Sequence, residues 1–219
     1  MQRLRAEGDF AAAAAQLQQA IGHGHLPSRA ALADMLLDGR EGVAMDKKRA
    51  FELAEEGARL DCHDCQGVVA RCYWGGFGCS ADEPRSLALA RASAGKGSKY
   101  GQRTLGRLYQ TGAGGVAQDD AAAVAQYRLA AAQHYDAAQY YLGYMYDNGY
   151  GVAQDKAEAL RYYKLAAAQG LGVALYNVAV YYEKGWVVVA DRAEAIHWYK
   201  RAAAAGGSAA ADRLKALGA

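Results

Sequence analysis

Apolar residues recur at helical spacing along most of this chain, in stretches separated by glycine-containing turns. Within residues 138–170, apolar side chains fall three or four positions apart over 138–146 and again over 159–167. This spacing predicts two amphipathic helices. Residues 148–151, with the sequence Asn-Gly-Tyr-Gly, separate them and suit the left-handed backbone that ends a helix.

The same pattern returns after a fixed interval. Corresponding residues lie 36 positions apart, as in Leu142 and Val178, Tyr146 and Tyr182, Gly149 and Gly185, Asp155 and Asp191, Tyr163 and Tyr199, and Gly170 and Gly206. A fixed period of this length is typical of stacked helical hairpins. Neither helix of one unit can bury its apolar stripe alone, so neighbouring units must stack.

These repeat positions resemble the Sel1-like repeat family, which is related to the tetratricopeptide repeats. The matching residues are Leu142-Gly143, Tyr146, Gly149-x-Gly151-Val152, Asp155, Lys156-Ala157, Tyr162-Tyr163, Ala166-Ala167 and Gly170. The resemblance implies an all-α fold, a right-handed superhelical solenoid of antiparallel helix pairs. We expect Gly143 to let the second helix of its repeat approach closely.

We expect a single solenoid domain with three parts. Residues 1–25 form a partial unit that caps the array, in which residues 3–7 end one helix and a second helix ends near Gly22. Residues 26–207 hold five Sel1-like repeats. Residues 208–219 form a final capping helix that covers the last repeat.

One aspartate in each repeat lies directly before the second helix. An aspartate at this position accepts hydrogen bonds from the first backbone N–H groups of the helix. The series resembles a set of catalytic carboxylates, but we interpret its members as N-caps: Asp46, Asp82, Asp119, Asp155 and Asp191.

The loop of the fifth repeat departs from the pattern, because Trp186 and Val187 replace Tyr150 and Gly151. A β-branched residue disfavours positive φ, so we expect this loop to differ in conformation. Trp186 either packs on the C-terminal helix or forms an apolar contact site for a partner.

Composition and charge exclude some classes of partner. The 219 residues are 53% hydrophobic and 22% charged, and the formal net charge is +2, so we expect no general attraction to nucleic acid or to an anionic membrane. No apolar run reaches the roughly 20 residues that a membrane span needs. No signal peptide is visible at Met1, and we expect a processed or trimmed chain because it opens within a hairpin.

Four cysteines cluster in the second repeat, at Cys62, Cys65, Cys72 and Cys79. Three interpretations stay open: free thiols, one or two disulfides, or a metal site. Cys65 and Cys72 lie seven residues apart on one predicted helix, about 10 Å along its axis, which excludes a disulfide between them.

No other residues suggest chemistry. The histidines outside the cysteine cluster have no partners at ligand spacing, so we expect them at the surface: His23, His25, His134 and His197. No nucleophile, base and orienting group recur together, and no loop suits a nucleotide phosphate. We therefore predict no catalytic residue, no cofactor and no metal.

A partner-binding strip is predicted from the related tetratricopeptide arrays, in which the first helix of each repeat lines the concave groove. Tryptophan, tyrosine and arginine are enriched in binding hot spots. The predicted strip, with the repeat-5 loop, is Arg71, Trp74, Tyr100, Arg103, Arg107, Tyr140, Tyr144, Asp147, Tyr176, Glu183, Lys184 and Trp186. Its arginines suggest an acidic feature in the partner. Alternatively, some of these tyrosines pack between repeats.

The resemblance implies a non-catalytic protein-binding module, monomeric when free. The chain is similar to Sel1-like immunity proteins, which neutralise secreted antibacterial toxins of the phospholipase type. We expect a periplasmic location if the chain is a processed immunity protein, and a cytoplasmic location otherwise. The alternatives are an adaptor or scaffold of a signalling or envelope complex, and a solenoid that binds glycans or small ligands. An enzyme is also considered, because some cysteine-rich Sel1-like proteins are linked to β-lactam binding or hydrolysis.

Overall fold

The computed structural model describes residues 9–40 and 42–219, and this part of the chain is helical throughout apart from its loops. The helices are α2 (Phe10–Gly22), α3 (Leu26–Asp38), α4 (Lys47–Ala58), α5 (His63–Gly75), α6 (Glu83–Gly95), α7 (Lys99–Thr111), α8 (Asp120–Ala132), α9 (Asp136–Asn148), α10 (Lys156–Ala168), α11 (Gly172–Lys184), α12 (Arg192–Ala204) and α13 (Ser208–Leu217). A short 3-10 turn, η1 (Ala113–Gly115), follows α7. Residues 3–7, expected to end a helix, lie outside the described residues.

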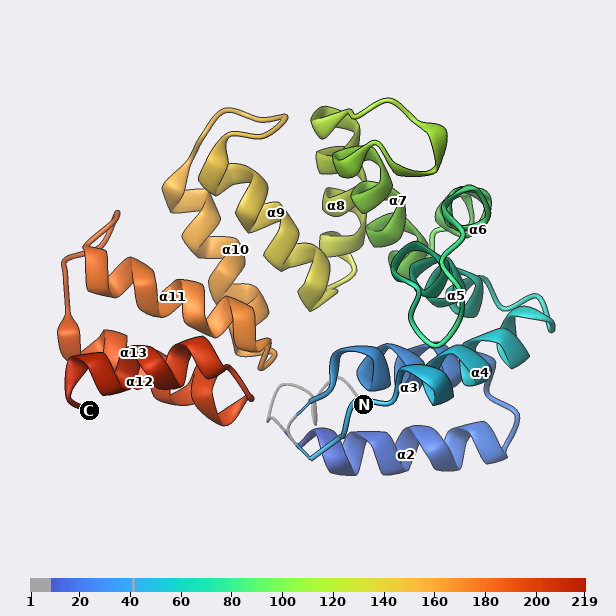
Figure 1. Cartoon of the computed structure of the whole chain (residues 1–219), viewed down its shortest axis with the longest axis horizontal. Coiled ribbons are helices and arrows are strands. Elements are labelled where there is room, and N and C mark those ends of the chain that lie inside the picture. Colours follow the sequence, from blue (N-terminus) through green and yellow to red (C-terminus); the bar gives the residue numbers. More distant parts are fainter. Residues whose placement is uncertain (1–8, 41) are drawn as a thin grey trace.

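The helices form antiparallel pairs that follow one another around an arc, which is the predicted solenoid (Figure 1). Each repeat contributes a first helix (α3, α5, α7, α9 or α11) and a second helix (α4, α6, α8, α10 or α12). The half-unit α2 packs on α3 at one end, and α13 packs on α12 at the other. The predicted final helix therefore covers the second helix of the last repeat.

The aspartates before the second helices are N-caps, as predicted. Each accepts a hydrogen bond from the backbone N–H three residues ahead, at 2.8–3.0 Å in every repeat. Gly143 also behaves as expected, because a Cβ there would lie 2.9 Å from the ring of Tyr163 on the paired helix. The repeat consensus is thus explained by capping and by close helix packing.

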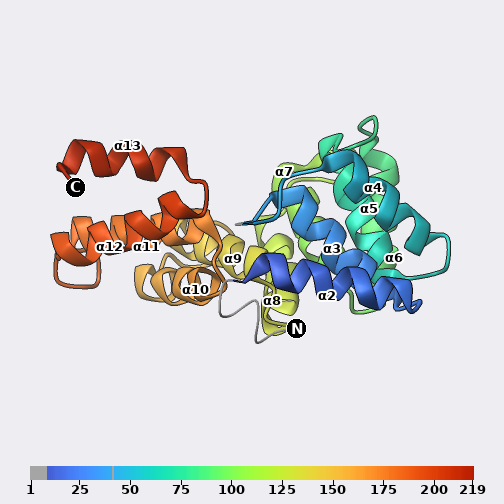
Figure 2. The same ribbon diagram turned by 90° about the horizontal axis from the view of Figure 1, so that it is seen from below.

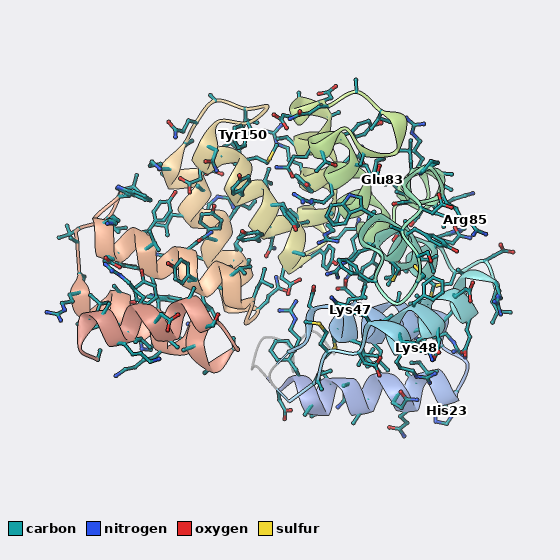
Figure 3. The ribbon with its side chains drawn as sticks, viewed as in Figure 1. His23, Lys47, Lys48, Glu83, Arg85 and Tyr150 are labelled. Atoms are coloured by element: carbon teal, nitrogen blue, oxygen red, sulfur yellow. The ribbon has the colours of Figure 1, made fainter. Side chains whose placement is uncertain are left out.

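The loops inside repeats 3 and 4 pack against the preceding repeat. Gly114 donates its backbone N–H to Glu83 at the start of α6, at 3.0 Å, and a Cβ on Gly151 would lie 2.3 Å from the backbone of Asp120 at the start of α8. Figure 3 labels Glu83, and it places Tyr150 of the α9–α10 loop at the outer edge of the molecule. These contacts fix the stacking of successive pairs.

The expectation for the repeat-5 loop is wrong. Val187 has a φ of 53°, close to the 65° of Gly151, and Gly185 has 69° where Gly149 has 73°. The loop therefore keeps the backbone conformation of the repeat-4 loop, and the β-branched side chain adopts the left-handed backbone at a cost of about 1–3 kcal/mol. Val187 is exposed, so its side chain meets no obstacle there.

A buried tyrosine on the second helix is tied to the end of the first helix in three successive repeats. The hydroxyl of Tyr127 donates to Gln110 at 3.0 Å, and that of Tyr199 donates to Glu183 at 2.7 Å. Between them, the hydroxyl of Tyr163 lies 3.5 Å from Asp147. This pairing satisfies a phenol that is otherwise surrounded by apolar side chains.

The arc brings the two ends of the solenoid toward each other. Seen from below, α11–α13 lie on one side and α2–α6 on the other, with α8–α10 between them (Figure 2). Residues far apart in sequence meet where the arc turns inward: a Cβ on Gly170 would lie 3.0 Å from the ring of Phe10, and Tyr135 reaches Asp34, 101 positions away.

Candidate functional site

The inner side of the arc holds a buried polar network, which we call the interior cluster: Asp34, Asp38, Arg40, Arg71, Tyr135 and Asp136. Arg71 donates to Asp34 at 2.8 Å and also to Asp38. Asp34 further accepts the hydroxyl of Tyr135 at 2.8 Å. Arg40 donates to Asp136 at 2.7 Å. The cluster links repeats 1, 2 and 4 across the inside of the superhelix.

The charges of this cluster neutralise one another. Burial by itself would raise the pKa of Asp38, but the attraction of Arg71 and Arg40 outweighs it, and the pKa lies below its usual value. Burial likewise opposes the charge on Arg71, yet Asp38 and Asp34 raise its pKa well above the ordinary range. Both groups therefore keep their charges and are paired within the chain, although the buried Nε of Arg71 has no hydrogen-bond partner among the described residues.

The interior cluster changes the interpretation of the predicted strip. Arg71 is 7% exposed, Arg103 is 5% and Tyr100 is 4%, so the expected continuous open strip is interrupted in its middle. The superhelix curls tightly enough for the first helices of different repeats to share side-chain contacts. Tyr100, for example, packs edge-on against the ring of Tyr135, with 5.2 Å between centroids.

Asp147 and Glu183 of the predicted strip are occupied within the chain. Asp147 accepts hydrogen bonds from Lys156 and from Tyr181, each at 2.8 Å. Glu183 is bound by Arg213 of α13, whose Nε donates at 3.0 Å. These carboxylates hold helices together, which gives them a structural role whether or not they also contact a partner.

An arginine held between aromatic rings remains partly open to solvent. The Arg107 guanidinium lies 5.0 Å from the ring centroid of Trp74 and 5.0 Å from that of Tyr141. Tyr144 lies on the same helix as Tyr141 and packs against Tyr150, with centroids 5.8 Å apart. We call Trp74, Arg107, Tyr141 and Tyr144 the arginine–aromatic patch; all four are half-buried.

Sequence reasoning missed Tyr141, although it found the other three members of the patch. Tyr141 directly precedes the repeat leucine, a position that the groove pattern of the related arrays does not count as inward. The ring nevertheless faces both Arg103, at 5.2 Å, and Arg107. The sequence did contain a signal for Tyr141, namely two arginines spaced four residues apart on α7. A ring on the neighbouring helix can contact two such side chains.

A cavity of ≈ 720 Å³ lies between the two ends of the arc. Arg40, Tyr140, Tyr176 and Arg201 contribute to its walls, and glycines and alanines of residues 204–210 form much of the rest. Tyr176 is held edge-on against Tyr199, with ring centroids 5.4 Å apart. Two residues of the predicted strip, Tyr140 and Tyr176, therefore line a cavity that is separate from the arginine–aromatic patch.

The last two members of the predicted strip lie at the end of α11. Lys184 is exposed. Trp186 is 39% exposed and packs edge-on against Tyr181, with centroids 5.4 Å apart. The Lys156 ammonium lies 4.3 Å from the centre of its indole ring. Trp186 thus packs on residues of repeats 4 and 5 rather than on the C-terminal helix.

The four cysteines are free thiols in the structure. Cys65 and Cys72 are buried, whereas Cys62, at the N-cap of α5, and Cys79 are half-buried. A hydrogen bond from Cys65 lowers the pKa of the Cys62 thiol to about 6, against the opposing effect of burial. Within residues 9–40 and 42–219, no group of three or more His, Cys, Asp or Glu side chains is placed to hold a metal.

One Ser-x-x-Lys sequence, a spacing that serine β-lactamases use, occurs at Ser93–Lys96. The Ser93 side chain is fully buried, and its hydroxyl donates to the carbonyl of His63 at 2.7 Å. A Cβ on Gly67 or Gly101 would approach this hydroxyl to within 2.8 Å. Ser93 therefore allows three helices to pack closely.

None of the described helices has the length and apolar character to cross a bilayer.

The fold is that of a superhelical protein built from repeated helix pairs. The pairs are antiparallel and stacked, their second helices are N-capped, and glycines in the loops allow close packing. The family model described as Sel1 repeat matches residues 27–62, 64–98, 100–135, 136–171 and 172–207. The chain belongs to the Sel1 repeat family, as its resemblance predicted.

Solved structures agree with this assignment. A Sel1 repeat protein from Oxalobacter formigenes is 28% identical, with 96% of this chain and 88% of that chain covered and a TM-score of 0.68. A sel1 repeat protein from Klebsiella pneumoniae subsp. pneumoniae is 24% identical, with 94% and 99% covered and a TM-score of 0.59. Immunity protein Pa5087 from Pseudomonas aeruginosa is 21% identical, with 85% and 68% covered and a TM-score of 0.57. A search of curated proteins finds no match.

Proposed function

We propose that the protein is a non-catalytic binding module that holds a protein partner against the arginine–aromatic patch. The carrying observation is the placement of Arg107 between Trp74 and Tyr141, because it combines rigid apolar area with a charge that still reaches solvent. Side chains of these types dominate binding energy at protein interfaces. They are also ordered before binding, which lowers the entropy cost of association.

The patch spans three repeats. Trp74 lies on α5, Arg107 on α7, and Tyr141 and Tyr144 on α9, so a partner would contact the first helices of repeats 2, 3 and 4 together. A solenoid offers this kind of extended surface because each repeat adds one helix to the same side.

For the partner itself, we propose a secreted antibacterial toxin of the phospholipase type, which this protein neutralises as an immunity protein. Support comes from the shared fold with a Pseudomonas aeruginosa structure described as an immunity protein. That likeness concerns the fold alone. An immunity protein needs a stable, preformed surface and no catalytic residue, and the patch meets both requirements.

A second candidate function is binding of a small ligand or glycan in the cavity between the two ends of the arc. Its volume of ≈ 720 Å³ lies in the range of ligand sites, and Tyr140 and Tyr176 line it. Tyrosine rings suit stacking on a sugar. This function would leave the arginine–aromatic patch without a role, so the two candidates predict different sensitive residues.

Affinity capture from the source cell tests the proposal. Wild-type protein and the Tyr144→Ala/Arg107→Ala double variant serve as paired baits, and mass spectrometry identifies what they retain. We expect one stoichiometric protein that the double variant loses, and the immunity role further requires that co-expression with the wild type relieves its toxicity. If Tyr176→Ala abolishes binding of a glycan or small molecule, and no protein is captured, the second candidate replaces the first.

A further inference from the structure

Arg103 is a buried cation without a carboxylate of its own. Its side chain is 5% exposed, and its Nη2 lies 3.4 Å from the hydroxyl of Tyr141, a long hydrogen bond. Its Nε and Nη1 are buried and have no hydrogen-bond partner among the described residues. Leaving a buried donor unsatisfied costs about 1–3 kcal/mol, and more when the group is charged.

Arg107 lies one helical turn further along α7 and shows the same deficit. Its Nη1 donates to Gln110 at 2.9 Å, whereas its buried Nε has no partner among the described residues. Trp74 and Tyr141 contact the guanidinium through their rings, which accept no in-plane N–H hydrogen bond from it. Two adjacent guanidiniums thus keep donors that nothing in the described chain accepts.

The carboxylates nearby are already occupied. Asp38, which acts on Arg103 through space, is bound by Arg71, and Asp136 is bound by Arg40. The pKa of Tyr141 reflects the positive charge of these arginines. Burial would raise its pKa, but Arg103 and Arg107 outweigh burial and lower it. A negative charge placed beside this ring would therefore be stabilised.

The two arginines differ in exposure. Arg103 is buried, whereas Arg107, Trp74 and Tyr141 are half-buried and partly exposed to solvent. A group that binds from solvent would therefore contact Arg107 and the two rings before Arg103. The rings suit the methylene groups of a side chain, and the two guanidiniums suit a planar anion at its tip.

We propose that Arg103 and Arg107 form a binding site for one carboxylate, delivered by an aspartate or glutamate side chain of the protein partner. This inference rests on the proposed function and names the group on the partner that the patch recognises. We choose a carboxylate because the proposed partner is a protein, in which aspartate and glutamate are the anionic side chains, and because a planar carboxylate accepts two parallel N–H bonds from a guanidinium.

A titration without any partner tests the site itself. The side-chain Nε–Hε resonances of Arg103 and Arg107 are followed by NMR as N-acetylglutamate amide is added at constant ionic strength. We expect saturable shifts at millimolar concentration, absent with neutral N-acetylglutamine amide. The Arg107→Gln variant should lose saturation at Arg103. Arg128→Gln is the matched control, since Arg128 also faces a ring, that of Tyr146, but is exposed, and it should keep saturation.

Shifts that stay linear with the glutamate probe, or that persist unchanged in Arg107→Gln, would overturn the site. Saturation by inorganic phosphate but not by the glutamate probe would overturn the carboxylate assignment. Because Arg107 is only half-buried, we expect Arg107→Gln to fold as the wild type does. An unchanged melting temperature together with lost saturation supports the site.

A second experiment measures the affinity of the captured partner for the same variants. Arg107→Gln should weaken binding at least about tenfold, whereas Arg128→Gln should not. Equal binding of the partner by Arg107→Gln and wild type would refute the inference and leave the proposed function standing. Saturation by the glutamate probe with no protein captured would instead refute the proposed function and the protein source of the carboxylate, while the anion site itself would stand.

Discussion

Val187 is the residue whose backbone conflicts most clearly with its side chain. It occupies, at a φ of 53°, a left-handed position that Gly78, Gly114 and Gly151 fill in earlier repeats. The sequence showed the conflict but not its outcome. Backbone hydrogen bonds from Trp186 to Tyr181 and from Asp191 to Tyr182 hold the two ends of the loop against α11, so the chain accepts local strain rather than a new loop conformation.

We therefore expect Val187→Gly to stabilise the protein by about 1 kcal/mol, the difference between a strain of about 1–3 kcal/mol and the entropy cost of glycine, about 0.5–1 kcal/mol. Urea unfolding measures the change. Val189→Gly is the matched control: Val189 is 88% exposed and does not have a positive φ, so glycine should not stabilise there. A less stable Val187→Gly protein would show that the left-handed backbone is not strained.

Cys62 differs from the other thiols in reactivity. The hydrogen bond from Cys65 lowers its pKa to about 6, whereas burial raises the pKa of Cys79 above its ordinary value of 9.0. The thiolate is the reactive form. Alkylation of Cys62 by iodoacetamide, followed by mass spectrometry, should rise through about pH 6, while that of Cys79 rises only in alkaline solution. Equal profiles would contradict the Cys62–Cys65 hydrogen bond.

At the scale of the element, most of the fold was predictable, because capping and helical periodicity are local. The aspartates, the loop glycines and Gly143 each have a requirement that acts within one helix pair. The tyrosine pairs with Gln110, Asp147 and Glu183 were not predicted, since the acceptors look like ordinary polar positions at the end of a first helix. The helix pair thus explains residues that sequence reasoning had assigned to a partner.

The repeat leucine gives the sharpest test of a single pair. Leu142 is fully buried, so Leu142→Ala should destabilise the protein by roughly 2–5 kcal/mol. Guanidinium unfolding gives the value. Leu165 on α10 is 40% exposed, and Leu165→Ala should change stability by less than about 0.5 kcal/mol. Similar losses at both positions would contradict the assignment of faces on α9 and α10.

The attachment of α13 should depend on pH. Hydrogen bonds from Arg213 first, and then from Tyr199, lower the pKa of Glu183 from 4.5 to about 2 in spite of burial. A folded-state pKa below the unfolded value means that the stabilisation is present above pH 4.5 and is lost as the pH falls toward 2. The melting temperature of Arg213→Gln should therefore lie below that of wild type near pH 7 and converge with it near pH 2. Lys215→Gln, which removes an exposed pair on the same helix, should show no such convergence.

At the scale of the whole molecule, the interior cluster could not be predicted from the sequence. Its contacts join residues up to 101 positions apart, and they exist only because of the curvature that accumulates over several repeats. Arg71 and Arg103 fit the groove pattern of related arrays equally well. Only the curvature of the superhelix distinguishes them, because it places the carboxylates of repeat 1 beside Arg71 and places Arg103 beside Tyr141.

The link between repeats 1 and 4 should be measurable as a coupling energy. Asp34→Ala leaves Arg71 buried with one fewer partner and should cost about 3–5 kcal/mol. Combined with Tyr135→Phe in a double-mutant cycle, it should show a coupling of about 0.5–3 kcal/mol, because the two side chains share a hydrogen bond. Additive effects would mean that the arc is not closed by this contact in solution.

The most direct test of the central claim measures the affinity of the captured partner for wild type and for the Tyr144→Ala/Arg107→Ala variant, with the melting temperature of each. Both side chains belong to the half-buried patch, so we expect melting to stay almost unchanged and binding to weaken by about 2 kcal/mol or more. Unchanged affinity would place the partner elsewhere on the solenoid. Unfolding of the variant would show that these side chains hold the superhelix together rather than present a binding surface.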